Sequence, residues 1–252
     1  MSNKVRLSAI SYLNTLPFLY GIYNNEDLLK EIDLTIDYPS ACAKKLIDGQ
    51  ADIGLVPVVS LKKIANAQIL DSFCISSSQA KSVMLFSDVP LTQIEQIMLD
   101  YQSLTSINLV KILAQKFWKI NFKYIQTTEG FENKIGSKKA AVVIGDRALN
   151  MLGKFNYQYD LALEWHNFTS LPFVFALWVA NKQLDEYFLE LFKAALNFGV
   201  SNIDKTLIFF KSHLKNINYD ANKYLTQNIN YKLSDEKLKS IDLFLNYLDD
   251  IF

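Results

Sequence analysis

Apolar residues in the first quarter of the chain fall into two kinds of run. Residues 53–56 form a short, fully apolar run, which is typical of a strand buried on both faces of a sheet, and residues 5–10 also predict a strand. Between them, residues 16–23 predict a helix with Pro17 in its first turn, and residues 40–49 predict a helix capped by Ser40. With a strand at 34–38 and a short helix at 58–64, the order predicts a parallel α/β sheet.

Further strands and helices are predicted between residues 82 and 179. The strands are predicted at 82–86, 97–99, 122–125, 140–144 and 173–179. The clearest amphipathic helix covers 103–118, and a shorter helix covers 145–152. After residue 184 the pattern is helical, and the segments 203–210, 221–225 and 235–248 each predict a helix.

The strands fall into a first set at 5–86, a second set at 97–144 and one returning strand at 173–179, and this order predicts two lobes. A chain that completes one α/β lobe, builds a second and then returns encloses a cleft between the two. The predicted first lobe contains residues 1–87 and 176–252, and the second contains residues 88–175. The fold class is therefore a two-lobed α/β architecture with a ligand cleft and a helical C-terminal region.

Composition narrows the possible partners. Half of the 252 residues are hydrophobic, and 26 basic residues balance 26 acidic ones, which disfavours a nucleic-acid-binding protein. No run has the length of a signal peptide or a membrane span, so we expect a cytoplasmic protein without a membrane partner. Cys42 and Cys74 lack metal-type spacing and are expected to be buried thiols, while two histidines alone cannot build a zinc site.

Three predicted strand-to-helix turns are rich in small polar groups. They are Ser11-Tyr12-Leu13-Asn14-Thr15, Ser103-Leu104-Thr105-Ser106 and Gly145-Asp146. Ligands of open α/β sheets bind outside the carboxyl ends of the strands, where helix N-termini offer free N–H groups to an anion. Each turn can equally be an ordinary helix cap, because Ser, Thr, Asp and Asn are the usual capping residues. Asn14 lies mid-loop, where capping explains it less well.

The remaining motifs give weaker evidence for a function than the three turns do. The chain has no GxGxxG, Walker, HExxH or GxSxG motif, which removes the main support for nucleotide binding, zinc proteolysis and serine hydrolysis. Glu164 and His166 would share one face if extended and could form an acid–base pair, or they could be a polar patch beside Trp165.

Several segments together resemble the chorismate dehydratase family of the futalosine route to menaquinone. They are ISYLNTLPF at 10–18, DGQADIGLVPV at 48–58, SVMLFS at 82–87, VVIGDRAL at 142–149 and EWHNFTSLPFVFALWVA at 164–180. The resemblance implies a fold like type II periplasmic binding proteins. It also implies loss of water from chorismate, a small dicarboxylate, to give 3-[(1-carboxyvinyl)oxy]benzoate, with no metal or organic cofactor.

The resemblance also implies which residues form the site. Asn14 is the expected catalytic residue, and the expected substrate-binding residues are Ser11, Tyr12, Ser82, Thr105, Ser106, Gly145 and Asp146. The family usually has Arg in the second turn where this chain has Leu104, so any anion contact made by that Arg is missing. An amide cannot accept a proton at neutral pH, so the role of Asn14 is orientation or charge stabilisation.

Two alternatives stay open at this point. The chain could be an anion-binding protein of the same fold without catalysis. It could also have the activity of the sister dihydroxynaphthoate synthases, although their Ser-Pro-Cys-Pro-Asn-Asp type of loop is absent. A monomer and a homodimer are both compatible with the sequence.

Overall fold

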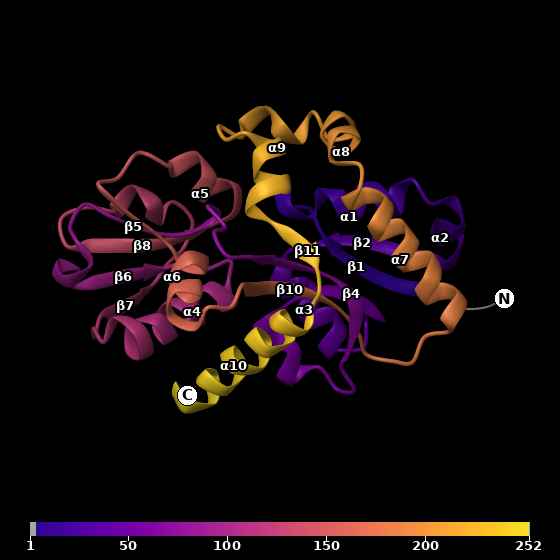
Figure 1. Ribbon diagram of the computed structural model, residues 1–252, viewed down its shortest axis with the longest axis horizontal. Helices are drawn as coiled ribbons and strands as arrows, with labels where there is room; N and C mark the ends of the chain where they lie inside the picture. Colours follow the sequence, from indigo (N-terminus) through magenta and orange to yellow (C-terminus); the bar gives the residue numbers. More distant parts are fainter. Residues whose placement is uncertain (1–3, 252) are drawn as a thin grey trace. The chain divides into compact units, whose positions relative to one another are not determined.

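The computed structural model describes residues 4–251, which form two compact α/β units (Figure 1). Unit 1 contains the described residues up to Ile75, together with Phe175–Asn216 and Asp220–Leu233. Unit 2 contains Ser76–Val174, Ile217–Tyr219 and the described residues from Ser234 onward. No helix in the described range is both long enough and apolar enough to cross a lipid bilayer.

Unit 1 is built on a six-stranded sheet with the order β11-β4-β10-β3-β1-β2. Its strands are β1 (Val5–Ile10), β2 (Ile32–Asp37), β3 (Ile53–Pro57), β4 (Gln68–Ser77), β10 (Phe173–Ala180) and β11 (Asn230–Lys232). Strand β1 pairs parallel with β2 and β3, and β10 pairs antiparallel with β3. The predicted parallel α/β core is therefore present, and the late strand returns to complete this sheet.

Unit 1 also contains helical segments of several lengths. They are η1 (Leu13–Thr15), α1 (Leu16–Tyr23), α2 (Glu26–Glu31), α3 (Pro39–Ile47), η2 (Val58–Lys63), α7 (Glu186–Val200), α8 (Ile203–Phe209), η6 (His213–Asn216), α9 (Ala221–Lys223) and η7 (Tyr224–Asn228). The prediction that Ser40 caps the third of these is wrong. Helix α3 begins one residue earlier because Pro39 takes its first turn, and Tyr38 occupies the capping position.

Helices α1 and α7 of unit 1 lie side by side at unusually close range (Figure 1). A Cβ atom built on Gly21 would lie 1.9 Å from the carbonyl oxygen of Ala195, and one on Gly199 would lie 1.7 Å from that of Pro17. Only residues without a side chain allow the two backbones to approach this closely. This contact fixes α1, and with it the turn that precedes α1 at the end of β1.

Asp52 ties the central strands of unit 1 together. Its carboxylate accepts hydrogen bonds from the backbone N–H of Arg6 at 2.9 Å and from the Arg6 guanidinium at 2.6 Å, and it lies 3.2 Å from Lys182 Nζ. Burial alone would raise the pKa of Asp52, but the bonds from Arg6 and Lys182 outweigh burial and lower the pKa to about 2. These bonds give Asp52 a structural role in unit 1.

We expect Asp52 to make unit 1 sensitive to acid. Its folded-state pKa lies below the unfolded value of about 3.9, so its contribution is present above that pH and is lost as the pH falls through about 2. In denaturant titrations, the difference in free energy of unfolding between wild type and Asp52→Asn should shrink by about 2 kcal/mol between about pH 5 and pH 2. Asp27→Asn, which removes a surface pair with Lys30, is the matched control and should show no such change. A wild type–D52N difference that does not vary with pH would contradict this assignment.

Unit 2 contains a five-stranded sheet with the order β7-β6-β8-β5-β9. Its strands are β5 (Val83–Ser87), β6 (Gln96–Leu99), β7 (Lys123–Gln126), β8 (Lys139–Ile144) and β9 (Tyr157–Asp160). Its helical segments are η3 (Leu91–Gln93), α4 (Leu104–Ile112), η4 (Leu113–Trp118), η5 (Phe131–Lys134), α5 (Gly145–Met151), α6 (Leu161–Thr169) and α10 (Asp235–Ile251). Strand β6 pairs parallel with β7 and β8, whereas β5 pairs antiparallel with β8 and β9.

Two elements lie in a different unit from the one predicted. The strand at 83–87 was assigned to the first lobe, but it pairs with β8 and β9 in unit 2, where Val83 is opposite Ile144. Helix α10 was also assigned to the first lobe, but it packs on α4, and Ser240 accepts a hydrogen bond from Trp165 Nε1 at 3.0 Å. Both pairings join residues that are distant in sequence, so the local pattern could not show them.

Candidate functional site

The first polar turn lies at the carboxyl end of β1, in unit 1. Tyr12 precedes the short helix η1, and the Thr15 hydroxyl donates to the carbonyl oxygens of Ile10 at 2.5 Å and Tyr12 at 2.8 Å. These bonds hold the turn closed and place Asn14 in its middle. The Oδ1 atom of Asn14 is buried and has no hydrogen-bond partner in the structure. Ser11 and Tyr12 beside it are half-buried.

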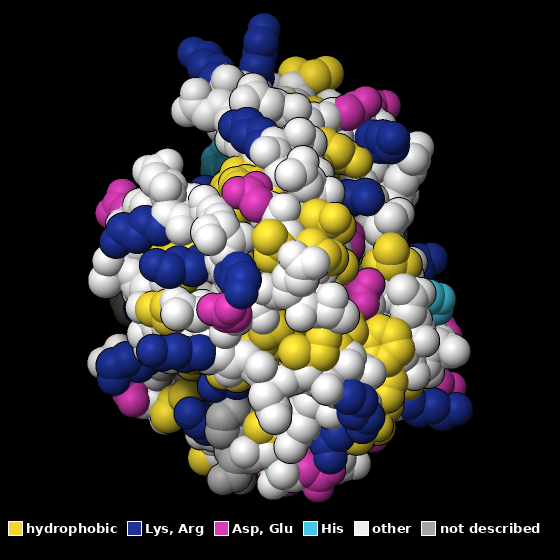
Figure 2. All heavy atoms as spheres, turned by 90° about the vertical axis from the view of Figure 1, so that its left-hand side faces the viewer, with side chains coloured by type: hydrophobic (Ala, Val, Ile, Leu, Met, Phe, Trp, Pro, Cys, Tyr) yellow, Lys and Arg dark blue, Asp and Glu magenta, His cyan; other side chains and the backbone are white. Residues whose placement is uncertain are grey.

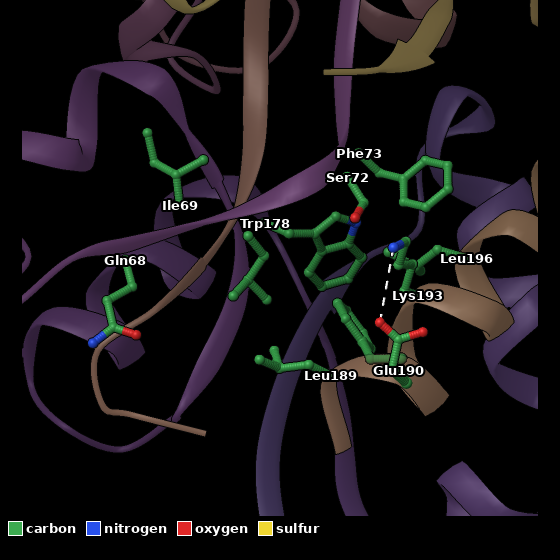
Figure 3. Close-up of a pocket in the computed structure, with 11 residues that line it drawn as sticks. Gln68, Ile69, Ser72, Phe73, Trp178, Leu189, Glu190, Lys193 and Leu196 are labelled. Carbon is green, nitrogen blue, oxygen red and sulfur yellow. Dashed lines mark ion pairs between the residues drawn. The ribbon is translucent and has the colours of Figure 1, made fainter. Parts of the chain in front are cut away.

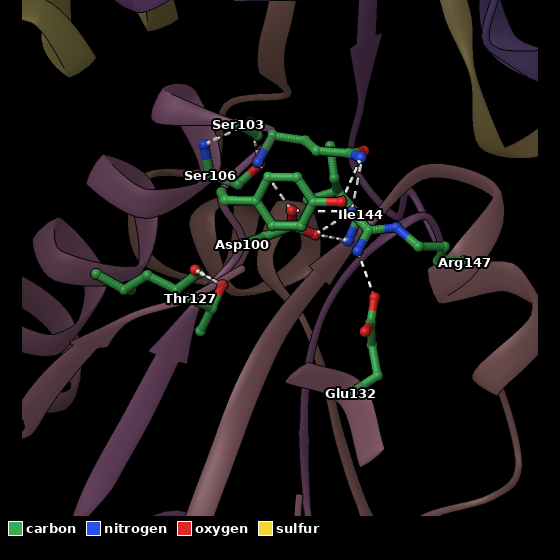
Figure 4. Close-up of polar contacts among 10 residues, drawn as sticks. Asp100, Ser103, Ser106, Thr127, Glu132, Ile144 and Arg147 are labelled. Atoms are coloured by element: carbon green, nitrogen blue, oxygen red, sulfur yellow. Dashed lines mark hydrogen bonds and ion pairs between the residues drawn. The ribbon is translucent and has the colours of Figure 1, made fainter. Parts of the chain in front are cut away.

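The second polar turn opens α4 in unit 2 (Figure 4). Ser103 caps the helix, because its Oγ accepts the N–H of Ser106 at 3.1 Å and lies 2.9 Å from the Ser106 hydroxyl. Ser106 is therefore engaged in the cap, whereas Thr105 is only 2% exposed and its hydroxyl has no partner. The amides of Leu104 and Thr105, which have no acceptor within the helix, complete the set of donors at this end.

The third turn joins β8 to α5 and meets the start of β5. Gly145 has a φ of +64°, and a Cβ built on it would touch nothing, so the backbone conformation alone requires glycine there. Its N–H donates to the carbonyl oxygen of Ser82 at 2.7 Å. Ser82 is buried, and Asp146 lies in the first turn of α5. The structure thus brings Ser82 and the Gly145-Asp146 turn to one edge of the unit 2 sheet.

Asp100 links the last two turns, and sequence reasoning did not identify it. Its fully buried carboxylate accepts the backbone N–H groups of Ile144 at 3.0 Å and Gln102 at 3.0 Å. It also accepts Nη2 of Arg147 at 2.7 and 2.8 Å, and Arg147 is further held by Glu132 and Gln102 (Figure 4). One carboxylate therefore fixes both the segment that leads into α4 and the start of α5.

Asp160 has a similar role for the segment before Ser82. Its carboxylate accepts the backbone N–H of Lys81 at 2.7 Å and of Ala80 at 3.2 Å, and it caps α6 through the N–H of Ala162 at 3.0 Å. Burial raises the pKa of this carboxyl, although the backbone donors act against the rise. Asp100 directly follows strand β6, whereas Asp160 ends the short, polar strand β9, so no local pattern in the sequence marks the two as equivalent.

A cavity of about 610 Å³ lies at the same edge of the unit 2 sheet. Residues that follow β6, β7 and β8 line it, as expected for ligand cavities of parallel sheets. Its charged lining residues are Glu129, Glu132, Arg147 and Lys154, so the cavity offers no excess of positive charge to an anion. None of the residues predicted from the sequence lines it.

The charge around the second turn is also balanced. Leu104, in the position where the resembling family has Arg, is 55% exposed, so this chain lacks a surface cation there. Arg147, the cation bonded to Asp100 and Gln102, is neutralised by Asp100 and Glu132. On the face in Figure 2, basic side chains are interspersed with acidic and apolar ones. An anion at this turn would therefore depend on amides and hydroxyls.

Glu164 and His166 do not form the acid–base pair that an extended segment would allow. Both lie in helix α6, where residues two apart are separated by roughly 200° around the axis. Glu164 Oε2 accepts a hydrogen bond from Trp118 Nε1 at 2.7 Å.

Cys42 and Cys74 are buried free thiols, as predicted. Burial raises the pKa of the Cys42 thiol to about 12, so it remains protonated at neutral pH. Within residues 4–251, no three His, Cys, Asp or Glu side chains are grouped so that they could hold a metal ion.

Comparison with known proteins gives a family match and several fold matches. A family model described as menaquinone biosynthesis matches residues 5–250. Protein AF1704 from Archaeoglobus fulgidus has a TM-score of 0.78 at 12% identity, covering 99% of this chain and 98% of its own. The periplasmic aliphatic sulphonate binding protein SsuA from Escherichia coli has a TM-score of 0.60 at 14% identity, covering 100% of this chain and 94% of its own.

A third solved structure belongs to a protein that is characterised by its fold. The CA3427 gene product of Candida albicans, described as having the generic periplasmic binding protein fold, has a TM-score of 0.61 at 11% identity. It covers 99% of this chain and 91% of its own length. At these identities the solved structures show the fold alone. The fold is periplasmic-binding-protein-like, as the resemblance of the sequence implied.

Proposed function

This chain belongs to the menaquinone biosynthesis family, and we propose that its reaction there is the dehydration of chorismate to 3-[(1-carboxyvinyl)oxy]benzoate. The enzyme would be a carbon–oxygen lyase that acts without a metal or organic cofactor. The family match supports a role in the pathway, and the five sequence segments that resemble chorismate dehydratases supply the particular step.

The observation that carries the proposal is a pair of unpaired oxygen atoms. Among the described side chains, five buried nitrogen or oxygen atoms lack a hydrogen-bond partner, and two of them are Asn14 Oδ1 and Thr105 Oγ1. Leaving such a group unpaired costs about 1–3 kcal/mol, so proteins retain few of them. Asn14, in unit 1, and Thr105, in unit 2, were each selected for ligand binding from the sequence, which favours a polar ligand as the partner of each atom.

The chemistry of the two residues suggests how they act. One substrate carboxylate accepts from the Thr105 hydroxyl and the amides at the start of α4, at the helix end that favours an anion. The Asn14 amide, with one acceptor and two donors, orients the hydroxyl that leaves. A ring proton passes to the substrate's own side-chain carboxylate, the C–O bond breaks, and the proton and hydroxyl depart as water while the ring becomes aromatic. The protein contributes positioning and donors rather than a base.

A non-catalytic anion-binding protein is the competing candidate. It is favoured by the likeness of the fold to the periplasmic aliphatic sulphonate binding protein SsuA. In that case the same polar groups would hold an anion without changing it.

Incubation of the purified protein with chorismate separates the two. We expect a product lighter by one water molecule, seen by mass spectrometry, and an aromatic ultraviolet spectrum that grows in proportion to protein concentration. A sample without protein corrects for spontaneous decay of chorismate. Chorismate recovered unchanged, from protein that binds it or another anion tightly, would overturn the dehydratase and favour the binder.

A further inference from the structure

Unit 1 contains a cavity of about 330 Å³ that is separate from the three polar turns (Figure 3). It lies where strands β4 and β10 meet helix α7, and β4 contributes Gln68 and Ser72 while β10 contributes Trp178. The volume is at the small end of the range for binding pockets, about 300–1,000 Å³, so it suits a compact ligand.

Trp178, which lines this cavity, carries an unpaired donor. The chain has three tryptophans, and two of them donate their Nε1–H within the protein, Trp118 to Glu164 at 2.7 Å and Trp165 to Ser240 at 3.0 Å. Trp178 is only 1% exposed, and its Nε1 is buried without a partner. Because an indole N–H is a donor only, the group that would complete it must be an acceptor.

The charges that line the cavity exclude a strongly ionic ligand. Glu190 and Lys193 on α7 are the charged lining residues, and their side chains pair with each other at 3.8 Å (Figure 3). Both are more than half exposed, so they face water and neutralise each other. A carboxylate entering the cavity would lose its hydration without gaining an unpaired counter-charge, which is costly.

The walls favour a flat and mainly apolar molecule. Phe73, Trp178 and Phe192 line the cavity, and the rings of Trp178 and Phe192 meet edge to face at 5.1 Å. In Figure 3 the Gln68 amide lies at the opposite end of the pocket from Lys193, so the polar groups are separated by an apolar middle. Aromatic walls of this kind recognise planar rings.

We propose that this cavity is a second ligand site, which binds a compact, flat, uncharged carbonyl compound whose oxygen accepts the Nε1–H of Trp178. The proposal does not depend on the reaction proposed for the polar turns. The binding measurement that tests it requires no catalytic activity.

The test follows the three indole N–H signals of ¹⁵N-labelled protein by nuclear magnetic resonance. The probe is 1-indanone, and the matched probe is indane, which has the same fused rings without the carbonyl. We expect 1-indanone to move the Trp178 signal saturably toward a hydrogen-bonded position, while the signals of Trp118 and Trp165 stay in place as internal controls. Indane should bind about tenfold more weakly, the usual effect of losing one hydrogen bond.

Two variants complete the test. Trp178→Phe removes the N–H but keeps an aromatic ring; it identifies the signal and should weaken 1-indanone binding about tenfold by calorimetry. Leu189→Phe narrows the cavity, keeps all three indoles and should abolish the shift even if Trp178→Phe does not fold. The absence of a saturable shift, equal shifts of all three signals, or tighter binding of benzoate than of 1-indanone would overturn the proposal.

Discussion

Replacement of Asn14 by alanine is expected to lower kcat by about 10²–10³-fold while changing the affinity for chorismate by less than about tenfold. A positioned amide acts mainly when charge develops in the transition state, and loss of one such donor has effects of this size. Removing Oδ1 breaks no hydrogen bond within the protein, because that atom has no partner there. Steady-state kinetics and a separate binding titration would distinguish the two effects.

Two further variants sharpen the test of Asn14. Asn24→Ala makes the same chemical change on the surface of unit 1, where the side chain donates to Tyr20 O at 2.8 Å, and should leave kcat unchanged. Asn14→Asp keeps an acceptor but loses the amide donors, and is expected to be as slow as Asn14→Ala. Turnover at the wild-type rate in Asn14→Ala would refute the catalytic assignment, and normal turnover in Asn14→Asp would refute a donor role.

The elements that the sequence predicted well are those whose local pattern agrees with their environment. Strand β1 and helix α1 have the predicted bounds, because apolar Val5, Leu7 and Ala9 alternate along the strand and the helix has Pro17 in its first turn. Strand β4 was missed beyond a short apolar run around Cys74. Polar residues interrupt it, and contacts with the distant Lys232 and Leu233 help to hold it in the sheet.

The same distinction holds for the candidate site. The polar turns could be found because small polar residues between a strand and a helix are a local signal. Asp100 could not, because an aspartate after a strand resembles an ordinary turn residue. Its partners Ile144 and Arg147 are 44 and 47 residues away, and only the pairing of β6 with β8 brings them within reach.

Replacement of Asp100 by alanine is expected to lower the free energy of unfolding by about 3–5 kcal/mol, the usual cost of removing one partner of a buried ion pair. The carboxylate is fully buried, and its loss leaves the backbone amides of Ile144 and Gln102 without their acceptor and removes both carboxylate oxygens from Nη2 of Arg147. A denaturant titration followed by circular dichroism would measure the change.

The matched control for Asp100 is Glu95→Ala, which removes an acidic partner from an exposed pair with Lys138 on the same unit. Exposed pairs contribute at most about 1 kcal/mol, so this variant should stay close to wild type. Equal stability losses in the two variants would show that burial of Asp100 does not matter. Because Asp100 holds both turns, the Asp100→Ala variant should also bind substrate more weakly than wild type under conditions where the variant is still folded. That result would separate a residue that positions the proposed anion-binding turn from one that only stabilises unit 2.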